Sequence, residues 1–206
     1  MRLYERGIHF YLSGLVILTL GIALCVISLL GTSPFDALLV GLYNTFGLSI
    51  GSWEIVIGLL MVFGNALVER ARPEYFAIIT SFITGIGIDS WLFVFNQLPM
   101  FDGLIAQWIY LSLGIFFTGL GIAIYLQSEI APNPIDRTMM LIRKYTGWNV
   151  TYSRALINVL FVIVAFFFDG AIGIGTLLNA IVVGMFIGLF LPFATNIRKQ
   201  RLPINS

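Results

Sequence analysis

The chain has 206 residues, of which 59% are hydrophobic and 10% are charged, and its formal net charge is +1. A soluble domain cannot cover its surface with polar side chains from such a composition, which excludes an ordinary globular protein and makes lipid the main solvent. The net charge by itself says nothing about nucleic acid, and we expect no nucleic-acid partner.

Six stretches are long and apolar enough to cross the bilayer as helices, since a crossing needs about 20 apolar residues. They cover roughly residues 8–28, 52–69, 75–96, 104–127, 151–168 and 175–195. We therefore expect an all-α membrane protein with six transmembrane helices, in one membrane domain of residues 1–206.

The first connection contains the segment GTSPFD, residues 31–36, which has the pattern of a helix start. Ser33 stands at the N-cap, Pro34 at the first helical position, and Asp36 at the third, where its carboxylate can bond back to the cap. The helix would cover residues 34–46 and measure roughly 20 Å, too short to span. It is apolar enough to enter the bilayer from outside.

The segment APNPID, residues 131–136, repeats this pattern one hundred residues later. Asn133, Pro134 and Asp136 take the three positions, and the predicted helix covers residues 134–146 with three basic residues. The two short helices either lie at the interface with ordinary caps, or are re-entrant, with N-terminal dipoles directed into the protein. A solute near them need not be an anion, because the two aspartates offset the positive N-terminal potential.

The offset of one hundred residues extends beyond these two segments. It aligns Gly14 with Gly114, Gly21 with Gly121, and Gly47 with Gly147. Each half holds three spanning helices, an odd number, so residues 101–206 form a second repeat inverted relative to residues 1–100. Inverted repeats are typical of many transporters.

Three further residues are polar at membrane depth and are therefore candidates for function. Asp89 should face a cavity or a partner helix. Arg154 either reaches Asp136, forming a polar face with Asn158, or extends toward the headgroups at the interface. Glu54 occupies the position equivalent to Arg154, and we expect these two residues at opposite membrane faces.

Basic residues lie before the first helix and after the second, fourth and sixth, whereas residues 29–51, 97–103 and 169–174 contain no Lys or Arg. The positive-inside rule then places both termini in the cytoplasm.

The motifs LGTSPFD, PNPID and GIGTLLNAIVVG, the last at residues 173–184, resemble those of the YczE/YyaS/YitT-type bacterial integral membrane proteins. The resemblance implies a bacterial plasma-membrane location and this fold rather than an activity.

The sequence contains none of the common nucleotide-binding, hydrolase or metalloprotease motifs, so we expect no enzyme, cofactor or metal site. The leading hypothesis is a transporter or channel for an unidentified small solute, with a polar site between the two short-helix N-termini. Alternatives are a substrate-binding membrane subunit of an uptake system and a non-transporting assembly or regulatory factor. A homo-oligomer and an energising partner subunit both stay open. Candidate substrate-binding or coupling residues are Ser33, Pro34, Asp36, Asp89, Asn133, Pro134, Asp136, Arg154 and Asn158.

Overall fold

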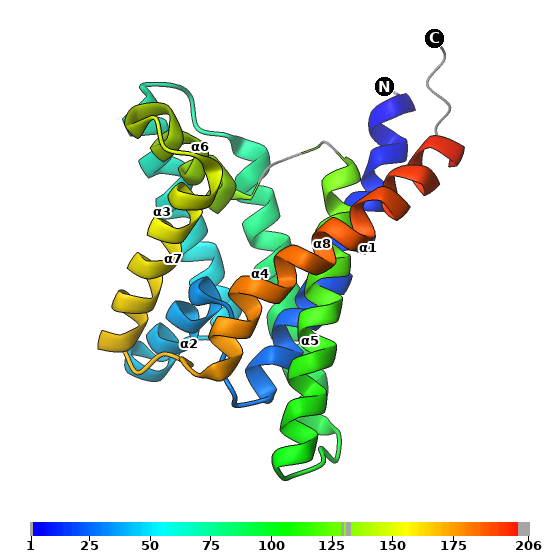
Figure 1. The fold of residues 1–206 in the computed structure, drawn as a ribbon, viewed down its shortest axis with the longest axis vertical. Helices are drawn as coiled ribbons and strands as arrows, with labels where there is room; N and C mark the ends of the chain where they lie inside the picture. Colours follow the sequence, from blue (N-terminus) through cyan, green and yellow to red (C-terminus); the bar gives the residue numbers. More distant parts are fainter. Residues whose placement is uncertain (1, 129, 131–132, 202–206) are drawn as a thin grey trace.

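The computed structural model describes residues 2–128, 130 and 133–201, and these residues form helices and no strand (Figure 1). Ala131 and Pro132 of the APNPID segment lie outside the described residues. In chain order the elements are α1 Arg2–Ile27, α2 Pro34–Phe46, α3 Ile50–Glu69, α4 Tyr75–Gln97, α5 Leu104–Tyr125, the 3-10 turn η1 Leu126–Ser128, α6 Pro134–Thr146, α7 Val150–Phe167 and α8 Ile174–Arg201.

Six helical segments in the described chain are long and apolar enough to cross a membrane, which confirms the six expected spans. They are Gly7–Ile27, Ile50–Glu69, Tyr75–Gln97, Leu104–Ser128, Val150–Phe167 and Ile174–Lys199. The two short helices, α2 and α6, begin and end at the residues predicted from their caps and their terminal glycines. The chain is therefore an all-helical membrane protein.

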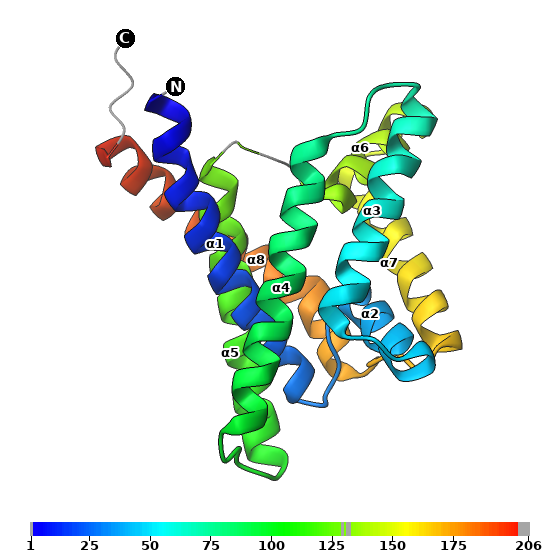
Figure 2. The same cartoon turned by 180° about the vertical axis from the view of Figure 1, so that it is seen from behind.

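The connections alternate between the two ends of the molecule (Figures 1 and 2). The two ends of the chain, the α3–α4 turn and α6 lie at one end. The α1–α2, α4–α5 and α7–α8 connections lie toward the other. Arg70, Arg72, Arg143 and Lys144 all belong to the connections at the end that holds the chain termini.

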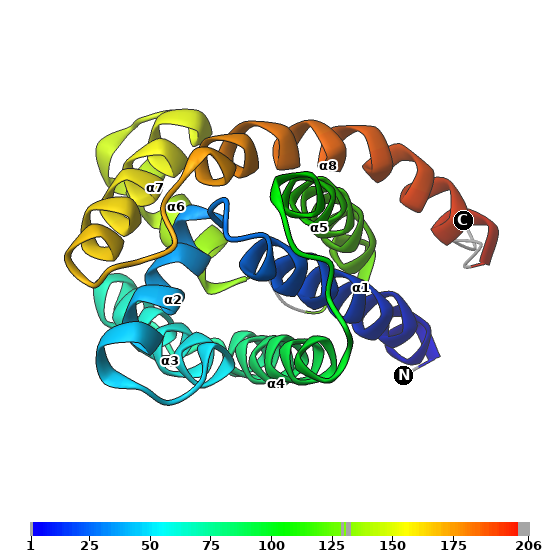
Figure 3. The same ribbon diagram turned by 90° about the horizontal axis from the view of Figure 1, so that it is seen from below.

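The helices form two groups, which the view along the bundle separates clearly (Figure 3). In the first group α1 packs against α5, with α4 beside α1 and α8 beside α5. In the second group α2 packs against α7 and α3, while α6 packs against α3 and α7. The contact between groups is one-sided, because α3 packs along α4 whereas α7 and α8 lie apart.

Glycines allow α1 and α5 to cross with their backbones in close approach. A Cβ atom added at Gly114 would lie 2.9 Å from the carbonyl oxygen of Gly21, and one added at Gly121 would lie 2.8 Å from that of Gly14. Only glycine fits such a crossing without moving a backbone. The two contacts are reciprocal: each joins a glycine of α1 to a glycine of α5.

The α1–α2 and α7–α8 connections are also bonded to each other. The Thr32 amide donates to the Ala171 carbonyl at 3.1 Å, and the Gly175 amide donates to the Leu30 carbonyl at 2.8 Å. These bonds fix the chain just before α2 and thereby set where its N-terminus lies.

Candidate functional site

The N-terminus of α2 is buried and capped as its sequence predicts. The Asp36 amide donates to Ser33 Oγ at 3.2 Å, and Ser33 Oγ donates to Asp36 Oδ2 at 2.6 Å. Pro34, at the first helical position, is buried as well. The last four residues of α2, 43–46, are exposed, so the helix has its N-terminal end inside the protein.

The Asp36 side chain is only 6% exposed, and its surroundings are largely apolar. This burial raises the pKa of Asp36 above its usual value, while the Ser33 hydrogen bond acts in the lowering direction. Asp36 can therefore hold a proton at a pH at which an exposed aspartate is ionised.

Glu54 of α3 is a second buried acid beside this helix start, and the sequence did not suggest it as a site residue. It is 5% exposed and lies within electrostatic reach of Asp36. No hydrogen bond or ion pair joins it to another described residue. The available signal was positional, because Glu54 stands one hundred residues before Arg154, as Asp36 does before Asp136.

The N-terminus of α6 is built in the same way from different residues. Asn133 Oδ1 accepts from the Ile135 amide at 3.0 Å, which caps the helix. The Pro134 carbonyl accepts from Asn65 Nδ2 of α3 at 3.1 Å. Pro134 is buried, whereas residues 143–146 at the other end of α6 are exposed.

Asp136 and Arg154 are brought together, as the sequence analysis anticipated. Arg154 Nη1 lies 3.8 Å from Asp136 Oδ1, which joins α6 to α7. Burial raises the pKa of Asp136, and the Arg154 guanidinium opposes this rise. Asn158 lies one turn beyond Arg154, half-buried, and makes no hydrogen bond to a described residue.

Asp89 of α4 binds the start of α3, one turn before Glu54. It accepts from Ser49 Oγ at 2.5 Å and from the Gly51 amide at 2.8 Å. Of the two roles weighed for it, a partner helix is the one seen. No hydrogen bond or ion pair among the described residues joins Asp89 or Asp36 to Asp136.

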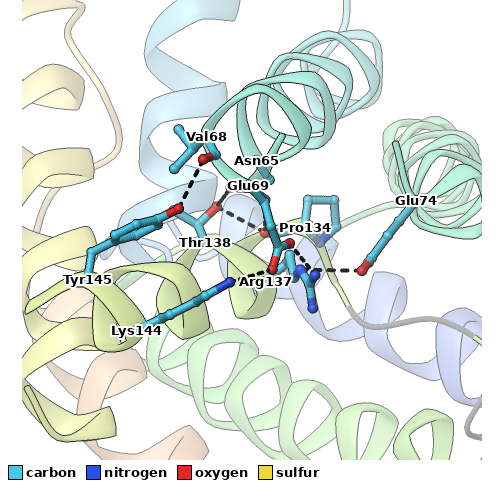
Figure 4. A network of polar contacts seen from close by, with 9 residues as sticks. All are labelled: Asn65, Val68, Glu69, Glu74, Pro134, Arg137, Thr138, Lys144 and Tyr145. Carbon is cyan, nitrogen blue, oxygen red and sulfur yellow. Dashed lines mark hydrogen bonds and ion pairs between the residues drawn. The ribbon is translucent and has the colours of Figure 1, made fainter. Parts of the chain in front are cut away.

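A third polar cluster joins α6 to the ends of α3 and α4 (Figure 4). Arg137 contacts Glu69 directly and lies 3.3 Å from Glu74 Oε1, while Lys144 Nζ lies 3.2 Å from Glu69 Oε1. These basic residues are those that suggested an interfacial α6, and here they bind acidic residues of the first half. A small pocket beside the cluster is lined by Asn65, Glu69, Glu74, Pro134 and Arg137, among others.

No group of three or more His, Cys, Asp or Glu side chains in the described chain is placed to hold a metal ion. The ionisable groups near the short-helix N-termini are instead two pairs: an acid with an acid at Asp36 and Glu54, and an acid with a base at Asp136 and Arg154.

Comparison with known proteins agrees with the resemblance seen in the motifs. The model of a family of unknown function, DUF6198, matches residues 5–192. The uncharacterized protein YyaS of Bacillus subtilis is 45% identical over 183 residues, covering 89% of this chain and 91% of that protein. The uncharacterized membrane protein YczE of the same organism is 37% identical over 184 residues, covering 89% and 84%. No solved structure matches.

Proposed function

For this chain, which belongs to the DUF6198 family, we propose the function of a membrane carrier for a small polar solute. The observation that carries the proposal is the pair of short helices, α2 and α6, whose N-termini begin at buried prolines and place ionisable residues beside them, with Asp36 buried and Asp136 half-buried. Ionisable residues inside a membrane are costly to bury and mark solute and ion pathways. We propose that both helices are re-entrant.

The carrier we propose consists of two inverted repeats, residues 1–100 and 101–206. The reciprocal glycine contacts support this. Under an offset of one hundred residues, Gly14 corresponds to Gly114 and Gly21 to Gly121. The contact of Gly14 with Gly121 therefore has a symmetry equivalent, the contact of Gly114 with Gly21, and both are present. The equal bounds of α2 and α6 at this offset support it too. An axis in the membrane plane would then pass through the α1–α5 crossing.

The unequal packing of the two repeats favours a carrier over a channel. Under the repeat, α3 and α4 correspond to α7 and α8, but only the first two pack together. In carriers with inverted repeats, one side is closed while the other is open, and the two conformations exchange. We infer that exchange would separate α3 from α4 and bring α7 to α8.

The proposed orientation follows from the basic residues. Arg70, Arg72, Arg143 and Lys144 lie at the end that holds both chain termini, and cytoplasmic connections carry an excess of such residues. We therefore propose a multi-pass protein of the bacterial plasma membrane with both termini in the cytoplasm. The single purified chain is proposed to act without an enzymatic step.

The test is solute movement by the purified full chain in liposomes. Vesicles are incubated with an isotope-labelled pool of polar bacterial metabolites, and the trapped compounds are identified by mass spectrometry. We expect at least one solute to accumulate above empty vesicles, and expect Arg154→Gln to abolish this while Lys199→Gln, outside the site, does not. If no labelled compound enters the vesicles, the carrier assignment is wrong. If uptake appears only with an added ATPase module, the chain is a binding subunit instead.

A further inference from the structure

The acid pair in the first half of the chain is not needed to complete the fold around it. Ser33 already caps α2, and Ser49 together with Asp89 already holds the first turn of α3. Glu54 is buried within that structure with no hydrogen-bond partner among the described residues. A buried carboxylate without a partner is strongly disfavoured, so Glu54 must be neutral or must share a proton with a neighbour.

The neighbour that the structure offers is Asp36. The side of α3 that carries Glu54 faces α2, since Trp53 and Ile57 pack against the cluster formed by Ala37, Leu38 and Leu42. Two carboxyl groups in one apolar site do not both ionise, and they titrate as a pair.

One turn beyond Glu54 along α3, a buried hydroxyl of α4 lies against Gly58. Ser81 of α4 lies against Gly58, is 2% exposed, and its Oγ has no hydrogen-bond partner. It is a second unpartnered polar group enclosed at this level between α3 and α4, next to the turn that carries Glu54. The region therefore offers more hydrogen-bonding capacity than the fold uses.

In the second half of the chain, the equivalent two residues form an ion pair, which needs no bound proton. At the same offsets stand Asp136 and Arg154, which neutralise each other across 3.8 Å. Where the second half has a base, the first half has Glu54. The acid pair lacks this internal counter-charge and needs one from outside.

The charged and titratable groups on the surrounding elements do not supply it. Residues 10–69 contain no Lys, Arg or His. The surrounding elements contribute the Cys25 thiol from α1, Asp89 from α4, already bonded to Ser49 and Gly51, and exposed Asp169 from the α7–α8 connection. Asp136 of α6 and Arg154 of α7 are paired with each other, and Arg137 and Lys144 of α6 are paired with Glu69 at the far end of α3. Arg143 is exposed at the far end of α6.

We propose that Asp36 and Glu54 together form a proton-binding site, which couples solute movement to protons; the coupling rests on the proposed carrier function. The fully deprotonated pair carries two negative charges, and one bound proton, shared between the carboxyl oxygens, leaves one. A proton suits the site better than a metal cation, because the described residues supply no third acidic ligand beside the pair.

The first experiment measures the proton itself and needs no knowledge of the solute. Infrared difference spectra of the full chain in nanodiscs are recorded across a pH titration, following the carbonyl band of protonated carboxyl groups. We expect this band to be present at neutral pH, to be lost in the double variant Asp36→Asn/Glu54→Gln, and to titrate at a different pH in each single variant. It should remain unchanged in Asp102→Asn, which alters an exposed acid. Glu54→Asp, which keeps the acid, should retain it. A band that is absent from the parent chain, or unchanged in both pair variants, overturns the proposal.

The second experiment separates the proton site from the carrier function. Uptake of the labelled metabolite pool into liposomes is compared with and without an imposed pH gradient. We expect the gradient to stimulate uptake by the parent chain and not by Glu54→Gln. If uptake is the same with and without the pH gradient, proton coupling is refuted, whereas the carrier function is not. A titrating carboxyl band without uptake of any compound refutes the carrier but leaves the proton site.

Discussion

Replacing Gly121 by alanine at the α1–α5 crossing should destabilise the protein, although alanine is the better helix former. The new Cβ would lie 2.6 Å from Leu18 Cα and 2.8 Å from the Gly14 carbonyl oxygen, both backbone atoms that cannot rotate away. Alanine gains about 1 kcal/mol over glycine in a helix, but overpacking costs about 1–3 kcal/mol. The net change at Gly121 is therefore expected to be a loss of up to about 2 kcal/mol.

Gly184 of α8 provides the matched control, because no heavy atom lies within 4 Å of a Cβ added there. Gly184→Ala should keep the helical gain of about 1 kcal/mol. The two variants should thus differ by about 1–3 kcal/mol.

Cys25 makes the assay direct, since it is the chain's one cysteine and is 2% exposed. A fluorogenic thiol reagent labels it only when the fold opens, so unfolding in detergent is followed as labelling against temperature or denaturant. Gly121→Ala should label at a lower midpoint than the parent chain, and Gly184→Ala at a higher one. Equal midpoints for the two alanine variants would refute the close crossing.

Three further predictions concern the short-helix N-termini. Ser33→Ala should lower the unfolding free energy by about 1 kcal/mol in the same assay, because the α2 cap is lost. Ser13→Ala is the control, since the Ser13 hydroxyl only bonds its own helix. Equal labelling midpoints for Ser33→Ala and Ser13→Ala would contradict the cap. Arg154→Gln should cost under about 1 kcal/mol, since Arg154 is 53% exposed, so a larger loss would show a structural role. Because burial raises the pKa of Asp36 to about 6, the folded state binds more protons than the unfolded one between about pH 4 and about pH 6. Stability should fall as pH rises through that window, and a slope unchanged in Asp36→Asn would contradict this.

The helices and their ends were largely predictable because membrane spans and caps depend on local sequence. Ser33 and Pro34 predicted where α2 begins, and Gly47 predicted where it ends. The structure has Ser33 as the N-cap, Pro34 as the first helical residue and Gly47 as the C-cap. Gly147 ends α6 in a left-handed conformation, with φ of 73°, for the same local reason.

The candidate site was predictable only in part, because its contacts depend on how distant helices pack. The Asp136–Arg154 pair could be anticipated, since the repeat places both residues near one end of adjacent helices. Glu54 was not predicted as a site residue, because the repeat places its equivalent, Arg154, at the opposite membrane face. Its nearness to Asp36 arises from the packing of α2 on α3, which no local pattern encodes.

For Asp89 too, the sequence predicted a polar contact but could not identify the partner. Its depth in the third spanning helix was a sound reason to expect a polar contact, but the sequence could not choose between a solute and a neighbouring helix. The buried Gly51 amide, in the first turn of α3, donates a hydrogen bond to that carboxylate, and this pairing depends on the register of α3 against α4.

The pairing of α1 with α5 has a consequence for how the chain is made. The glycine face of α1 packs against a helix that is synthesised roughly a hundred residues later, which corresponds to about 5–20 s at ordinary rates of translation. Until then the nascent α1 presents a strip of bare backbone to the lipid or to the insertion machinery. We expect chains interrupted before α5 to be recognised as incomplete and degraded, so that the first half does not accumulate alone in the membrane.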